Sequence, residues 1–352
     1  MMRSHLQPPD ATDYCLYMKH LLAGSFLLLC ATLTIARGDA VSDLAGFSVF
    51  GKIDISQLTK SDLKSMHGPP MSGRFLSVES CYVMPGSPAQ QGEALRQWNP
   101  IKHRELKVFL HGDLPASPTP ANFSKLKDAP DEGSVGLLVA ATQKVSSDLQ
   151  VSKEEAKKFP KDASGGGTMP AAVVTFWSDV LASRAKAFAS GGTAAQPPYD
   201  HSGDTIRAND ELNSLLKQQD KIRKQFSGFL NQTGIGRGAG SLTPELYWEL
   251  LEVDDHGVLT LGASYGRAGA EGTYQAADVL YYASGGYYVA LTLYQMWPVT
   301  VDGKASTLVW RGDMISSATL AELHGVERLG SESAMMKDIS RAITLFRKDT
   351  AH

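Results

Sequence analysis

The longest apolar run near the C-terminus, residues 287–297, alternates two kinds of side chain with a period of two residues. This period is typical of a β-strand, whose successive side chains point to opposite faces of a sheet. Neighbouring runs are rich in branched and aromatic residues and are separated by turn sequences such as Ser284-Gly285-Gly286, so we expect an antiparallel meander. The expected strands are 247–253, 258–264, 278–283, 287–297 and 307–315.

Helical spacing of apolar residues, with a period near 3.6, marks the middle and the end of the chain. Residues 168–191 and 209–231 each carry an apolar stripe, and residues 333–347 carry a third one. The run 247–251 follows a Thr-Pro-Glu sequence, so a short helix is the alternative to a strand there.

The N-terminal part combines two strand-like runs, 75–84 and 106–111, with a helix that Ser87-Pro88 opens. Four prolines between residues 112 and 133 predict a loop. Together the elements predict an α+β fold with an antiparallel C-terminal sheet, a terminal helix and a helical middle segment. The expected parts are an N-terminal extension with signal peptide (1–40), an α/β portion (41–133), a helical segment (134–242) and the sheet with its terminal helix (243–352), with one domain over 41–352 as the alternative.

Two parts of this pattern resemble the START and polyketide-cyclase superfamily, whose fold is called a helix grip. One is the strand that runs into a proline-opened helix at Tyr82–Ala89, and the other is the series of antiparallel strands followed by the helix 333–347. The resemblance implies a curved sheet that grips a long helix around a lipophilic pocket.

Export is indicated by residues 18–40, which follow the three-part pattern of a secretory signal peptide. A short positive flank precedes a 13-residue, mostly apolar run over 21–33, and Gly38 and Ala40 precede the expected cleavage site at Val41. We expect synthesis to start at Met18 and the mature chain to be periplasmic or secreted, without a transmembrane span. An uncleaved membrane anchor is the alternative.

Composition and charge exclude several classes of protein. The chain has 352 residues, with 34 Lys and Arg against 37 Asp and Glu and a formal net charge of −3, which is unsuited to a strongly basic nucleic-acid surface. Three cysteines are too few for a disulfide scaffold. The nine histidines show no metal-ligand spacing, so we expect neither metal nor cofactor.

Gly262-Ala263-Ser264-Tyr265-Gly266 matches the nucleophile elbow of serine hydrolases, in which a strand, the serine and a helix follow one another. With His324 downstream, this motif supports a hydrolase as one alternative. Three glycines among residues 266–273 disfavour the required helix, however.

One alternating face of the run 287–297 mixes aromatic bodies with hydroxyl groups, which is suited to lining an apolar pocket with a few polar groups. We therefore predict that Tyr288, Thr292 and Tyr294 bind a ligand, with an ordinary two-sided sheet as the alternative. The leading hypothesis is an exported, non-enzymatic protein that binds an apolar small molecule or an envelope partner. A structural envelope protein without a small-molecule site is the other alternative.

Overall fold

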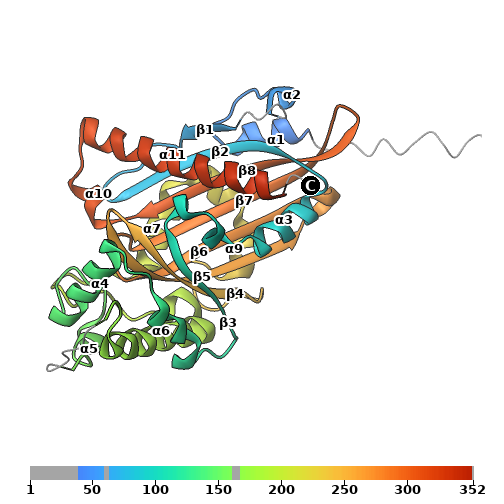
Figure 1. The fold of residues 1–352 in the computed structure, drawn as a ribbon. Helices are drawn as coiled ribbons and strands as arrows, with labels where there is room; N and C mark the ends of the chain where they lie inside the picture. Colours follow the sequence, from blue (N-terminus) through green and yellow to red (C-terminus); the bar gives the residue numbers. More distant parts are fainter. Residues whose placement is uncertain (1–38, 59–62, 161–166, 351–352) are drawn as a thin grey trace, which may run out of the picture. The chain divides into compact units, whose positions relative to one another are not determined.

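Eight antiparallel strands form one sheet in the computed structural model, which describes residues 39–58, 63–160 and 167–350 (Figure 1). Across the sheet the order is β1-β2-β8-β7-β6-β5-β4-β3. The strands are β1 (Lys64–His67), β2 (Phe75–Pro85), β3 (Val108–Leu114), β4 (Glu245–Val253), β5 (His256–Ala268), β6 (Tyr274–Ala283), β7 (Val289–Val301) and β8 (Lys304–Ser316). The predicted meander is therefore confirmed as β4 to β8, and the alternative of a short helix at 247–251 is wrong.

The helices connect and flank this sheet. They are α1 (Ala40–Phe47), α2 (Ile55–Leu58), α3 (Pro88–Gln97), α4 (Gly133–Lys144), α5 (Lys153–Ala156), α6 (Ala171–Gly191), α7 (Ala208–Gln218), α8 (Asp220–Gln225), α9 (Ser227–Thr233), α10 (Ala318–Glu322) and α11 (Gly325–Thr350). Short 3₁₀ helices are η1 (Pro100–Lys102), η2 (Arg104–Leu106), η3 (Pro120–Asp128), η4 (Gly192–Ala195) and η5 (Ala270–Gly272). The predicted α+β class, with a helical middle and a C-terminal helix, is confirmed.

Helices α3 and α11 cover one face of the sheet (Figure 1). Ser87 caps α3, because its hydroxyl accepts a hydrogen bond from the backbone N–H of Gln90 while the Gln90 side chain accepts one from the Ser87 backbone N–H. Helix α11 buries Ile339, Ile343 and Phe346 in a small core with residues of β2, β7 and β8.

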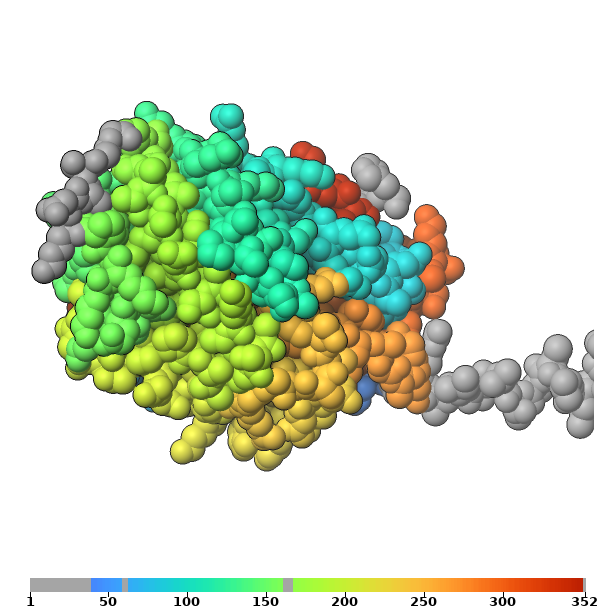
Figure 2. Space-filling model, turned by 90° about the horizontal axis from the view of Figure 1, so that it is seen from below, coloured from blue at the N-terminus to red at the C-terminus, as the bar shows by residue number. Residues whose placement is uncertain are grey.

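The helical segment α4 to α9 packs on the opposite face, together with α1, and forms the larger core. Figure 2 shows the green to yellow residues of this segment packed together beside the orange strands. Trp177 of α6 is fully buried there, and its Nε1 donates a hydrogen bond to Thr142 Oγ1 at 2.9 Å. This segment lies on the face away from α3 and α11, so it does not fill the space between those two helices and the sheet.

Three boundaries differ from the sequence-based expectation. The helix expected over 209–231 is three helices, α7, α8 and α9, because the backbone leaves helical geometry at Gln219 (φ −113°, ψ 60°) and Phe226 (φ −94°, ψ 7°). The predicted loop 112–133 contains η3, and α11 begins earlier than residue 333. The predicted signal peptide and its start at Met18 lie outside the described residues up to position 38. Among the described helices, none combines the length and the apolar character that crossing a membrane requires.

Candidate functional site

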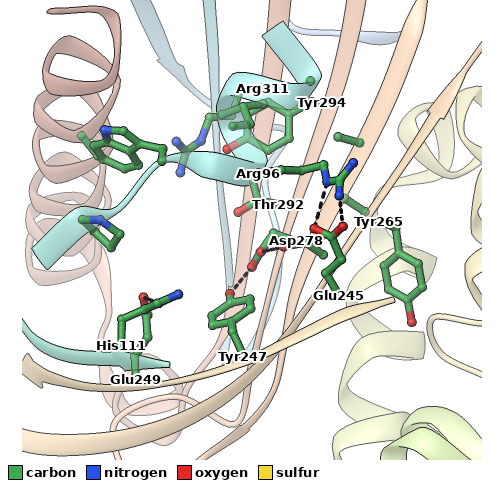
Figure 3. Close-up of a pocket in the computed structure, with 18 of the residues that line it drawn as sticks. Arg96, His111, Glu245, Tyr247, Glu249, Tyr265, Asp278, Thr292, Tyr294 and Arg311 are labelled. Carbon is green, nitrogen blue, oxygen red and sulfur yellow. Dashed lines mark hydrogen bonds and ion pairs between the residues drawn. The ribbon is translucent and has the colours of Figure 1, made fainter. Parts of the chain in front are cut away.

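A cavity of about 420 Å³ lies between the sheet and the cover formed by α3, η1 and η2 (Figure 3). Its walls are apolar and aromatic above, and polar on the sheet below. Residues of the upper wall are Gly92, Leu95, Trp98, Pro100, Leu106 and Ala342. Residues from the sheet are Val108, His111, Asp113, Glu245, Leu246, Tyr247, Glu249, Ser264, Tyr265, Tyr274, Ala276, Ala277, Asp278, Thr292, Tyr294 and Arg311, and Arg96 of α3 completes the lining.

The polar floor follows from strand register. Glu245 lies opposite Ser264, Ser264 opposite Asp278, and Asp278 opposite Thr292, so β4, β5, β6 and β7 each contribute one polar residue to a single row. Residues opposite one another in register share a face of the sheet. The row therefore crosses the floor of the cavity.

Asp278 is the centre of the hydrogen bonding on this floor. Tyr247 Oη donates to Asp278 Oδ1 at 2.6 Å, and Ser264 Oγ donates to Asp278 Oδ2 at 2.7 Å (Figure 3). Burial raises the pKa of the Asp278 carboxyl, and the two hydroxyl donors oppose this by stabilising the carboxylate. The result is a carboxyl whose partners within the protein are uncharged hydroxyl groups.

The glycines of the GASYG motif make room for aromatic rings. A Cβ at Gly262 would lie 2.1 Å from Tyr247 Cζ, and one at Gly266 would lie 2.2 Å from Tyr274 Oη. Without a side chain at position 262, the Tyr247 ring lies over β5 and reaches Asp278 on the next strand. The motif is thus explained by packing of rings across a strand.

Ser264 does not have the surroundings of a nucleophile elbow. It lies inside β5, which continues to Ala268, and the next long element is strand β6 instead of a helix. Its hydroxyl donates to Asp278 and not to a histidine. His324 is exposed between α10 and α11, so the two residues of the hydrolase alternative are not brought together.

His111 and two carboxylates form a second polar group at the β3 side of the cavity. The Nδ1 of His111 lies 3.1 Å from Glu249 Oε1, and its Nε2 lies 3.4 Å from Asp113 Oδ1. Burial acts to lower the pKa of His111, but the hydrogen bonds and charges of the two carboxylates outweigh it and raise the pKa. The imidazole also stacks on the Tyr247 ring, with ring centres 5.6 Å apart.

Two arginines reach the cavity already paired with carboxylates. Arg96 Nε of α3 donates to Glu245 Oε2 at 2.9 Å, and a second, shorter contact joins Arg96 Nη2 to Glu245 Oε1, so this pair ties α3 to β4 across the cavity (Figure 3). On β8, Arg311 Nε donates to Asp313 Oδ2 at 2.8 Å and Arg311 Nη2 donates to Asp313 Oδ1 at 2.7 Å. Thr292 Oγ1 also donates to Asp313, at 2.9 Å.

The predicted ligand-binding residues separate into two places. Thr292 and Tyr294 line the cavity. Tyr288 packs on Tyr199 in the larger core, with ring centres 6.0 Å apart. The physical reason is that β7 begins at Val289, so the alternation of faces does not extend back to residue 288.

Three further aromatic residues of the neighbouring strands lie on the other side of the sheet, away from the cavity. Tyr281, Tyr282 and Trp310 are fully buried in the larger core. Tyr281 follows the alternation of β6, in which Ala277 and Val279 also lie in the larger core. Tyr282 joins them through a β-bulge, because the register passes from Tyr282 opposite Leu261 to Leu280 opposite Gly262 and leaves Tyr281 unpaired.

Most of the charged floor was missed at the sequence level. Tyr247 and Glu249 of β4 alternate with the buried residues Trp248 and Leu250, which is a signal that the sequence does contain. Asp278 was distinguished only as one of several acids between Ser264 and His324 and not as a residue of the cavity floor, since a lone acid in a strand is ordinary. Among the described residues, no three His, Cys, Asp or Glu side chains meet as metal ligands.

The chain matches none of the family models, curated proteins or solved structures with which it was compared.

Proposed function

We propose that this protein is an exported, non-enzymatic binding protein that holds a small molecule between α3, α11 and the sheet. The observation that carries the proposal is the cavity of about 420 Å³, which has an apolar upper wall and a polar floor. This volume lies within the range of small-molecule sites, roughly 300 to 1,000 Å³. Leu95, Trp98 and Leu106 would bury the apolar body of the ligand, and the floor would orient its polar groups.

The cover of the cavity is anchored to the terminal helix, as a stable binding site requires. Trp98 Nε1 donates to Asp349 Oδ2 of α11 at 2.9 Å, and the Trp98 ring meets the Phe346 ring edge to face at 5.7 Å. His103 Nε2 lies 2.7 Å from the same Asp349 oxygen. These contacts join the chain that follows α3 to α11 on the same side of the sheet.

The proposal extends to a helix-grip architecture. Two observations support this extension. Strand β2, which leads into α3, pairs with β8, the last strand of the meander. Helix α11 follows β8 after the short α10 and packs against β1 and β2. The resemblance implies a pocket between sheet and helix, and the cavity lies on that face. The helical segment would then be an insertion between β3 and β4.

Probe binding tests the proposal. N-phenylnaphthylamine, a neutral fluorescent probe, should bind the wild type saturably and raise its melting temperature with concentration. Ala276→Trp should abolish binding, because residue 276 faces the cavity and takes part in no side-chain hydrogen bond that the change would break. Ala290→Trp, in β7, is the matched control on the same face of the sheet but outside the cavity lining, and this variant should bind the probe normally. Absence of saturable binding to the wild type would contradict the proposal and favour a structural envelope protein.

The hydrolase alternative has a separate test. Since Ser264 donates to Asp278, fluorophosphonate probes should leave the purified protein unlabelled. Stoichiometric labelling that disappears in Ser264→Ala would instead establish a nucleophilic serine.

Export is proposed on the pattern of residues 18–40. Mass spectrometry of the periplasmic or secreted fraction should find a chain that starts near Val41. Recovery of full-length protein alone, in the membrane fraction, would contradict cleavage and support an anchor.

A further inference from the structure

The carboxylates around the cavity differ in whether the protein neutralises them. Glu245 pairs with Arg96, and Glu249 and Asp113 pair with His111. On β8, next to Thr292 on the same face of the sheet, Asp313 pairs with Arg311. Each basic group that lines the cavity is thereby paired with an acid.

Asp278 is the exception. Among the residues that the structure describes, none forms an ion pair with it, and the partners of both its oxygens are the hydroxyls of Tyr247 and Ser264. The positive charge of Arg311 acts on Asp278 from a distance, but the guanidinium donates its hydrogen bonds to Asp313. Asp278 is half-buried, and a carboxyl in such a place without a counter-ion is uncommon, because withdrawing a charge from water is costly unless a partner compensates it.

The hydroxyl groups of the floor present oxygen lone pairs to the cavity. A hydroxyl has one hydrogen to donate. Tyr247 and Ser264 donate theirs to Asp278, and Thr292 donates its own to Asp313. The floor therefore offers hydrogen-bond acceptors around Asp278 and favours a ligand group that carries several N–H donors.

Aromatic rings complete the surroundings. Trp98, Tyr247, Tyr274 and Tyr294 all line the cavity. The faces of such rings attract organic cations, and Arg311 already lies over one of them, with its Cζ 5.5 Å from the centre of the Tyr294 ring. Acceptors, aromatic rings and an uncompensated carboxyl together describe a site for positive charge.

We infer that the ligand of this cavity is an organic amine, bound as its ammonium ion with Asp278 as the counter-ion and with its apolar body beneath Leu95, Trp98 and Leu106. This inference rests on the proposed function, since it names the class of ligand that the same cavity holds. The ammonium donates hydrogen bonds to Asp278 and to the lone pairs of Tyr247 and Ser264. A carboxylate or phosphate would meet acceptors and like charge at the same place.

Three probes that share one aromatic body and differ in charge test the inference. Naphthylmethylamine is an ammonium ion at neutral pH, naphthalenemethanol is neutral, and naphthoate is an anion. In titration calorimetry, the amine should bind at least about tenfold more tightly than the alcohol, because its charge pairs with a desolvated carboxylate, and naphthoate should bind weakest of the three. This comparison uses wild-type protein and does not depend on any variant that folds poorly.

Two variants assign the effect to its residue. Asp278→Asn keeps the shape and one acceptor oxygen, and should remove the preference for the amine over the alcohol. Asp302→Asn is the matched control, since it deletes the same charge in the turn between β7 and β8, outside the lining of this cavity, and asparagine tolerates the positive φ of that residue (49°). It should leave all three affinities unchanged.

The possible results distinguish failure of the amine inference from failure of the proposed binding function. Equal or tighter binding of the alcohol or of naphthoate would overturn the amine inference while leaving a small-molecule site in place. A preference for the amine that survives in Asp278→Asn would overturn the role of Asp278. If none of these probes and no N-phenylnaphthylamine binds, the proposed function itself fails.

Discussion

Gly262→Ala should be strongly destabilising, and only because of one neighbouring ring. The added Cβ would lie 2.1 Å from Tyr247 Cζ, whereas ordinary contact begins near 3.4 Å, so the ring has to move by more than 1 Å. That movement breaks the hydrogen bond of 2.6 Å from Tyr247 Oη to Asp278. Overpacking typically costs about 1 to 3 kcal/mol, and losing a hydrogen bond to a charged group costs about 1.5 to 3 kcal/mol. We expect a total loss of about 2 to 4 kcal/mol, since the two effects partly overlap.

A double-mutant cycle isolates the ring as the cause. In a Tyr247→Ala background the space over Gly262 is empty, so the same Gly262→Ala change should be neutral or stabilising, because alanine suits a strand better than glycine by roughly 0.5 to 1 kcal/mol. Gly136→Ala in α4 is the control for glycine replacement in general: no atom lies within 4 Å of its Cβ position, and it should stabilise the protein by about 1 kcal/mol.

Urea denaturation monitored by tryptophan fluorescence gives each free energy of unfolding by linear extrapolation. An equal loss of stability from Gly262→Ala with and without the Tyr247 ring would refute the explanation of the motif by ring packing. So would an unchanged stability of Gly262→Ala in the wild-type background.

Two further predictions concern charged groups. The folded-state pKa of His111 lies above its ordinary value of 6.5. Its pairing with Glu249 and Asp113 should therefore contribute stability that is complete below about pH 6.5 and is lost as the pH rises through the folded-state pKa. His111→Gln should flatten the plot of unfolding free energy against pH in this range, and an unchanged plot would contradict the pairing. Arg184 and Glu155 form a buried ion pair, with Arg184 Nη2 donating to Glu155 Oε2 at 2.6 Å. Arg184→Met should therefore destabilise the protein by about 3 to 5 kcal/mol in urea denaturation. Adding Glu155→Gln should recover part of this loss, because it removes the unpaired charge. If the double variant is no more stable than Arg184→Met alone, the broken ion pair is not the cause of the loss.

The sequence pattern predicted the elements wherever the determining contacts are local. Residues 287–297 alternate clearly enough that both faces of this strand could be assigned from Val289 onward, and Leu291 and Leu293 lie in the larger core while Thr292 and Tyr294 face the cavity. The start of α5 depends on equally local contacts, because Ser152 and Glu155 satisfy each other's backbone N–H groups within one turn.

The same reasoning failed where one residue changes the register. A slip of a single position moves a side chain to the opposite face of a sheet. The bulge at Tyr281 and the start of β7 at Val289 are such positions, and they place Tyr282 and Tyr288 on the side of the larger core. Nothing in the local pattern of these residues marks either event.

The sequence by itself determined the period of most elements, the α+β class and the two faces of β7, because these depend on neighbouring residues in the chain. The tertiary structure alone decided that Tyr247, Ser264 and Asp278 meet, because they come from three strands and their contact depends on the pairing of β4, β5 and β6. It also decided the meaning of Gly262, whose missing side chain matters only once β4 lies beside β5 and the Tyr247 ring crosses it.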